Sequence, residues 1–62
     1  MIKEYQHLLG KKGTIPMNNH IRMGVEIIDI RMGPYQQPHA LVRPVAGSGE
    51  MWVLLDRVRL EE

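Results

Sequence analysis

Three histidines are the residues of this chain best suited to metal or acid–base chemistry. His7, His20 and His39 are far apart in the sequence, so no two of them stand four positions apart, as ligands on one helix face do. The common alternative, a zinc site with thiolate ligands, is impossible because the chain has no cysteine. We therefore expect loop or surface histidines, with no metal and no cofactor.

The nucleophiles and carboxylates are too few and too scattered for a catalytic group. Ser48 is the only serine and stands between two glycines, and Thr14 is the only threonine. Asp29 and Asp56 each have an arginine one or two positions further on, which favours the ionised carboxylate. A domain of this size also lacks the volume of a usual substrate pocket. We expect no enzyme and no small-molecule substrate.

Cationic side chains are the next candidates, because nucleic-acid binding requires them on one face of a domain. Lys11 and Lys12 precede the first expected strand, and Arg57 and Arg59 lie around the last one, so pairing of these strands would form one patch. A second patch could contain Arg22, Arg31 and Arg43. The formal charge is only +1, with acidic residues interspersed, so the field is weak. Nucleic acid is therefore the alternative partner rather than the first.

Aromatic residues limit the kinds of ligand that the chain can recognise. Tyr5, Tyr35 and Trp52 are the only rings, whereas proline-rich peptides and methylated lysines require several exposed ones. We expect Trp52 to lie at least half in the core and Tyr5 to hold a helix. Tyr35, between two prolines, is the best candidate for an exposed binding ring.

The chain has 62 residues, of which 44% are hydrophobic, and this predicts a single domain over residues 1–62. Ile2, Tyr5, Leu8 and Leu9 have helical spacing, which predicts a short helix over residues 2–9. Gly10 is the expected left-handed stop after that helix.

Five short β-strands are expected in the remainder, over residues 13–17, 23–32, 39–45, 50–55 and 58–60. In the second strand the apolar alternation changes phase between Ile27 and Ile28, which predicts a bulge or a sharp bend. A helical turn at Asp56 precedes the last strand. Such a set of short strands can hide its edges by closing into a small barrel over residues 11–60.

The expected core contains the following residues: Leu8, Ile15, Val25, Ile28, Ile30, Leu41, Val42, Trp52, Val53, Leu54 and Val58. The run from Gly10 to Ile15 resembles the start of a KOW-type strand. The run from Leu41 to Val58, with its Gly47-Ser48-Gly49 turn, resembles the distal hairpin, final turn and last strand of an SH3-like barrel. This resemblance covers residues 10–60 and implies an SH3-like, mainly β fold of the KOW and Tudor type. Such barrels bind peptides, methylated tails, RNA, DNA or other subunits.

Association with protein is the function that the sequence favours. Five methionines in a short chain suit an adaptable contact surface, and Met17, Met23 and Met32 lie near expected loops. A domain this small is also stabilised when it associates. We expect a protein partner or a homo-oligomer. The sequence predicts neither a signal peptide nor a membrane-spanning segment, and hence a cytoplasmic setting.

Overall fold

The protein is mainly β in the computed structural model, which describes residues 3–61. Five strands follow one another along the chain: β1 (Lys12–Pro16), β2 (Arg22–Met32), β3 (Pro38–Pro44), β4 (Met51–Leu54) and β5 (Arg59–Leu60). Three short 3₁₀ helices complete the structure: η1 (Lys3–Leu8), η2 (Pro34–Gln36) and η3 (Leu55–Arg57). All five expected strands are confirmed, as is the helical turn before the last one.

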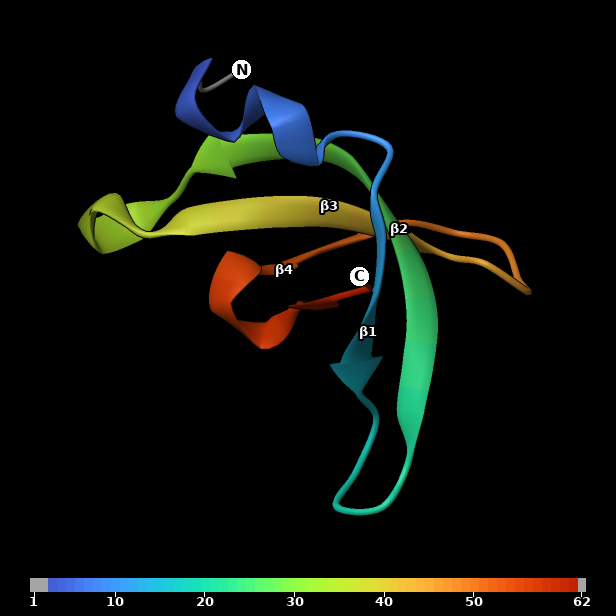
Figure 1. The fold of residues 1–62 in the computed structure, drawn as a ribbon. Coiled ribbons are helices and arrows are strands. Elements are labelled where there is room, and N and C mark those ends of the chain that lie inside the picture. Colours follow the sequence, from blue (N-terminus) through green and yellow to red (C-terminus); the bar gives the residue numbers. More distant parts are fainter. Residues whose placement is uncertain (1–2, 62) are drawn as a thin grey trace.

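The strands form one antiparallel sheet with the order β4-β3-β2-β1-β5. The expected pairing of the first and last strands is confirmed by Gly13 opposite Leu60 and Thr14 opposite Arg59. Figure 1 shows that the sheet curls strongly around its concave side. The sheet is not closed, however, because β4 and β5 are its two edge strands. Along the chain, η3 connects them. The five-stranded curled sheet is therefore confirmed, and the prediction that it closes into a barrel is not.

A β-bulge in β2 confirms the predicted change of phase. Ile27 pairs with Val42 but Asp29 pairs with Leu41, so Ile28 is the extra residue. Each residue beyond the bulge is thereby moved to the opposite face, and the strand bends. Ile27 is fully buried whereas Ile28 is only partly buried, so the expectation that Ile28 belongs to the core is wrong.

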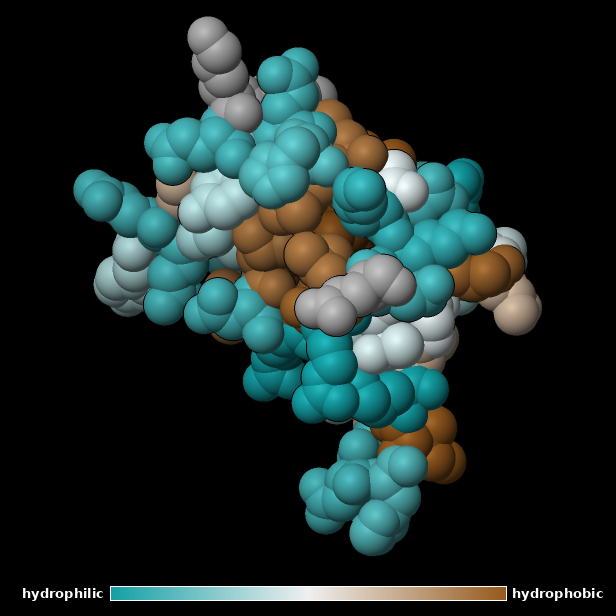
Figure 2. Space-filling model, in the orientation of Figure 1, coloured by the Kyte–Doolittle hydropathy of each residue, from teal (hydrophilic) through white to brown (hydrophobic). Residues whose placement is uncertain are grey.

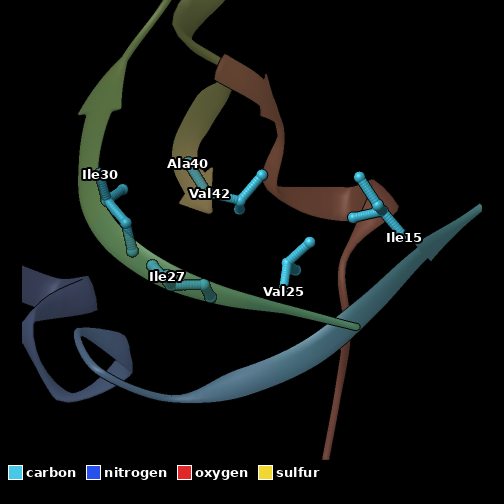
Figure 3. Close-up of a cluster of buried hydrophobic side chains, with 6 residues drawn as sticks. All are labelled: Ile15, Val25, Ile27, Ile30, Ala40 and Val42. Atoms are coloured by element: carbon cyan, nitrogen blue, oxygen red, sulfur yellow. The ribbon is translucent and has the colours of Figure 1, made fainter. Parts of the chain in front are cut away.

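The core lies on the concave face of the sheet. Its buried residues are Ile15, Val25, Ile27, Ile30, Ala40 and Val42. Figure 3 shows their side chains directed into the space between β1, β2 and β3. Leu8, Val53 and Val58 are partly buried against this cluster, as their inclusion in the expected core implied.

Register explains why Leu41 and Trp52 are outside the core, contrary to expectation. Residues directly opposite each other in an antiparallel pair share a face. Ala40 is opposite Ile30 and Val53, and this row points inward. Leu41 is opposite Asp29 and Trp52, so this row points outward, and Trp52 is 36% exposed. Leu54, two positions after Trp52, is partly buried on the same outward face.

The N-terminal segment is a six-residue 3₁₀ helix rather than the predicted helix over residues 2–9. Ile2 lies outside the described residues. Tyr5, Leu8 and Leu9 nevertheless pack against the core, as their spacing predicts. Gly10 has a φ of +83°, which confirms the left-handed stop. Residues 3–61 contain no helix that is long and apolar enough to span a membrane.

The hairpin of β1 and β2 projects beyond the curled part of the sheet (Figure 1). At its tip the backbone N–H of Met17 donates to the carbonyl of Ile21 at 2.8 Å. The Asn18 side-chain oxygen accepts from the backbone N–H groups of His20 and Ile21 at 2.8 and 3.0 Å. This Asx-type turn orders the tip through backbone contacts and leaves its apolar side chains exposed.

Candidate functional site

Acidic residues alternate with the cationic side chains at the start of β1. Lys12 is opposite Glu26, which is in turn opposite Arg43 on β3. The Arg43 guanidinium lies 3.5 Å from the Glu26 carboxylate. On the other side, the Glu61 N–H donates to the Lys12 carbonyl at 2.9 Å, so the register places Glu61 opposite Lys12. The charges in this row therefore largely offset one another.

The four cations expected around the first and last strands occupy different elements. Arg59 is opposite Thr14 and shares the outward face of β1 with Lys12. Lys11 precedes β1, and Arg57 belongs to η3. All four side chains are exposed. The strand pairing thus brings Lys12 and Arg59 to one face and leaves the other two outside the strands.

The three remaining arginines of the predicted binding set have separate partners. Arg22 donates through Nε to the Thr14 hydroxyl at 2.8 Å and through a terminal nitrogen to the Thr14 carbonyl at 3.0 Å. Arg31 lies over the indole ring of Trp52. Arg43 faces Glu26 on the neighbouring strand β2. Each guanidinium is therefore engaged within its own part of the outward face.

Tyr35 is the most exposed large apolar side chain in the described residues, at 93%. It lies in the loop between β2 and β3, where Tyr35 and Gln36 have φ values of 60° and 59°. This left-handed conformation is unfavourable for residues other than glycine, asparagine and aspartate. The loop is held by an N–H···O bond from Gly33 to Gln37 at 2.8 Å. Tyr35 is accordingly an exposed ring on a hydrogen-bonded loop, as its position between two prolines led us to expect.

The three histidines lie in three different parts of the fold. His39 makes a 2.9 Å contact between Nδ1 and the Gln37 carbonyl, while His7 and His20 are exposed in η1 and in the β1–β2 turn. In the part of the chain that the structure describes, no three His, Asp or Glu side chains come together as a metal site would require.

An apolar hollow of about 270 Å³ opens at one end of the concave face. It lies between the start of β2 and the β3–β4 turn, and its lining residues are Met23, Pro44, Ser48, Gly49, Glu50 and Met51. We call it the methionine hollow. Pro44 is opposite the buried Val25, and Met51 is opposite the buried Val42, so the hollow continues the inward face of the core. It is the open end of the hydrophobic core, where the curled sheet is not covered.

The apolar surface also extends along the hairpin. Ile15 is opposite Met23, and Met17 is opposite Ile21 two residues further on, so these side chains share the inward face. Met17 and Ile21 are 57% and 56% exposed. Figure 2 shows hydrophobic side chains near the hairpin end, apart from the larger hydrophobic area at the centre of that view. We call Met17 and Ile21 the hairpin tip pair.

The methionines of the sequence predicted part of this apolar surface. Met17 and Met23 lie on it, but Met32 lies at the far end of β2. Met51, expected in a strand without a surface role, also lines the hollow. The signal that could have found it was the alternation along β4, because Met51 and Val53 share the inward face once Val53 is placed in the core.

No family model, no curated protein and no solved structure matches this chain.

Proposed function

We propose that this chain is a small, non-catalytic association module that binds protein, either a second copy of itself or a partner subunit, through the methionine hollow. The observation that carries the proposal is the open end of the core, where Met23 and Met51 border a hollow of about 270 Å³. Its volume is below the ~300–1,000 Å³ of small-molecule pockets, so it suits apolar side chains of a partner.

The physical basis is the burial that association would add. A domain of 62 residues buries only about 60% of the surface of its unfolded chain and is stable by a narrow margin. Covering exposed Met51, Met17 and Ile21 would add apolar burial at about 25 cal/mol per Å². Methionine is unbranched and flexible, so it can adapt to a partner without a preformed fit.

We further propose that the module has the SH3-like architecture implied by the sequence resemblance. Three features support it: five antiparallel strands in a curled sheet, a long bent second strand, and a 3₁₀ turn between the last two strands. This architecture is compatible with many ligands, so the proposed partner class depends on the surface and not on the fold.

Photo-crosslinking through methionine tests the proposed surface. The chain would be prepared with a diazirine analogue of methionine and irradiated both alone and in an extract of the cells that produce it. We expect intermolecular adducts with protein at Met23 and Met51, and few at Met32, which is 47% exposed and serves as the internal control. Adducts confined to Met32, or no intermolecular adduct under either condition, would contradict the proposal.

Nucleic-acid binding is the second candidate, and one observation favours it. Arg22 is anchored on Thr14, and Arg59 is opposite Thr14 on β5, so two guanidinium groups flank one point of the outward face. The offsetting charges in the Lys12 row weigh against it. Fluorescence anisotropy with mixed oligonucleotides would decide. Binding should weaken steeply between about 50 and 200 mM salt, and Arg59→Gln should weaken it for all sequences. Absence of binding at low salt would eliminate this candidate.

A further inference from the structure

Arg22 and Thr14 form a hydrogen-bonded pair on the outward face of β1 and β2. The Arg22 Nε donates to the Thr14 hydroxyl at 2.8 Å, and a terminal nitrogen of the same guanidinium donates to the Thr14 carbonyl at 3.0 Å. These two bonds set the direction of the guanidinium and leave its other N–H groups available. The Thr14 hydroxyl accepts from Arg22, so its own hydrogen can donate to another acceptor.

Strand alternation directs this guanidinium toward β5. The Lys12 carbonyl accepts from the Glu61 N–H and therefore points to the β5 side of β1. Carbonyl groups two positions apart in a strand point to the same side, so the Thr14 carbonyl also points toward β5. Arg59 is opposite Thr14 on β5 and shares its outward face. The Arg22 nitrogen that reaches the Thr14 carbonyl thus lies on the side of Arg59.

No carboxylate neutralises these two arginines within residues 3–61, where the only ion pair joins Arg43 and Glu26. On the strands beside β1, the acidic residues Glu26 and Glu61 lie one outward row further along, next to Lys12. Two cations that share a face without a counter-charge repel each other, and an anion bound between them turns this repulsion into attraction. The row at Thr14 therefore has an unbalanced positive charge, unlike the row at Lys12.

Gly24 leaves room for a ligand beside Thr14. It is opposite Thr14 on β2, in the same outward row. A Cβ atom at Gly24 would have only atoms of Val45 within 4 Å, the nearest at 3.8 Å, so this part of the outward face is open. Guanidinium groups bind the oxygens of a phosphate by paired N–H bonds, and a hydroxyl can add a further bond. The donors and the charge at Thr14 thus suit a phosphate group.

We propose that Arg22, Thr14 and Arg59 form a binding site for a phosphate group, which we call the Thr14 site. The two guanidinium groups supply the charge, and Thr14 orients Arg22 and adds its hydroxyl. The site lies on the face opposite the methionine hollow, so it goes beyond the proposed association function. A free phosphate ion and one phosphate of a nucleic-acid backbone share this chemistry. In the second case the site deepens, and rests on, the nucleic-acid candidate.

Titration with inorganic phosphate, followed by NMR of the backbone amides and the arginine Nε–H groups, tests the site. Sodium chloride at the same ionic strength is titrated in parallel. We expect phosphate-specific shifts at Thr14, Arg22 and Arg59. Arg22→Gln and Arg59→Gln should each weaken phosphate binding about tenfold. Arg57→Gln is the matched control, since it removes the same charge from η3, and it should change the affinity by less than about twofold.

Two substitutions of Thr14 separate its hydroxyl from its size. Thr14→Val removes the acceptor for the Arg22 Nε at nearly equal volume, whereas Thr14→Ser keeps the hydroxyl. The valine variant should lose affinity and the serine variant should retain it, with circular dichroism confirming that both fold. Equal shifts in phosphate and chloride would overturn the site. An affinity that Arg22→Gln and Arg59→Gln leave unchanged would overturn it as well.

A single-stranded oligothymidylate, titrated in place of phosphate, distinguishes the two sources of the ligand. Binding of both probes with shifts at Thr14 supports the site and assigns it to nucleic acid. Binding of phosphate alone supports a site for the free ion and eliminates the nucleic-acid candidate. Oligonucleotide binding that leaves the Thr14 signals unchanged overturns the site but not that candidate. If neither probe binds, both are overturned, and the association function on the opposite face is unaffected.

Discussion

The guanidinium carbon of Arg31 lies 4.2 Å from the centroid of the Trp52 ring, on the outward face of the sheet. The two residues belong to β2 and β4 and reach each other across β3. This contact shields one face of an indole that is otherwise partly exposed. It connects the edge strand β4 to the centre of the sheet by side chains as well as by backbone pairing.

Removing this contact should weaken the sheet slightly and change the environment of the only tryptophan. We expect Arg31→Gln to lower the free energy of unfolding by about 0.5–1 kcal/mol, the usual value of an exposed cation–π contact. Urea unfolding followed by tryptophan fluorescence measures both effects. Arg43→Gln is the control, since Arg43 faces Glu26 and not the indole. Equal changes in the two variants would speak against a specific Arg31–Trp52 interaction.

The bulge in β2 predicts very different costs for two adjacent isoleucines. Ile27 is fully buried, so Ile27→Ala should lower the free energy of unfolding by about 2–5 kcal/mol through lost burial and a cavity. Ile28 is the extra residue of the bulge and only partly buried, so Ile28→Ala should cost clearly less. Denaturant unfolding of both variants gives the comparison. A larger loss of stability for Ile28→Ala than for Ile27→Ala would mean that Ile28, and not Ile27, points into the core.

Gly13 is required by the close approach of β5. A Cβ atom at Gly13 would lie 2.5 Å from the Arg59 carbonyl oxygen, so Gly13→Ala must push β5 away from β1. We expect a loss of about 1–3 kcal/mol in stability, as is typical of overpacking. Faster amide exchange is also expected at Glu61, whose N–H bonds to Lys12. Gly24→Ala is the matched control on β2, where the nearest atom would be 3.8 Å away, and a similar loss there would contradict the explanation.

The left-handed conformation at Tyr35 predicts a stabilising substitution. Tyr35→Gly should raise the free energy of unfolding by up to about 1 kcal/mol, because glycine adopts this conformation without steric cost. Thermal unfolding gives the result. Gln37→Gly serves as the control, since Gln37 has an extended backbone with φ of −98° and should only lose stability. If both variants were destabilised alike, the loop would not store the strain that its φ values imply.

Local sequence patterns determined a large part of the fold. Glycine and proline mark the ends of the strands, alternation marks the strands themselves, and the change of phase at Ile27 and Ile28 marks the bulge. These features depend on the φ and ψ preferences of neighbouring residues, and so they can be read from a single chain. Gly10, with its positive φ, is the simplest example.

Only the tertiary structure decided which side chains face inward, because facing depends on register between strands distant in sequence. Leu41 is opposite Asp29 and points outward, and Trp52, which is opposite Leu41 on β4, points to the same face. Strand register also prevents a continuous cationic patch around Lys12, because the neighbours of Lys12 across the sheet are acidic. The methionine hollow likewise exists only because Met23 and Met51, on different strands, meet at the end of the sheet that its curl leaves uncovered.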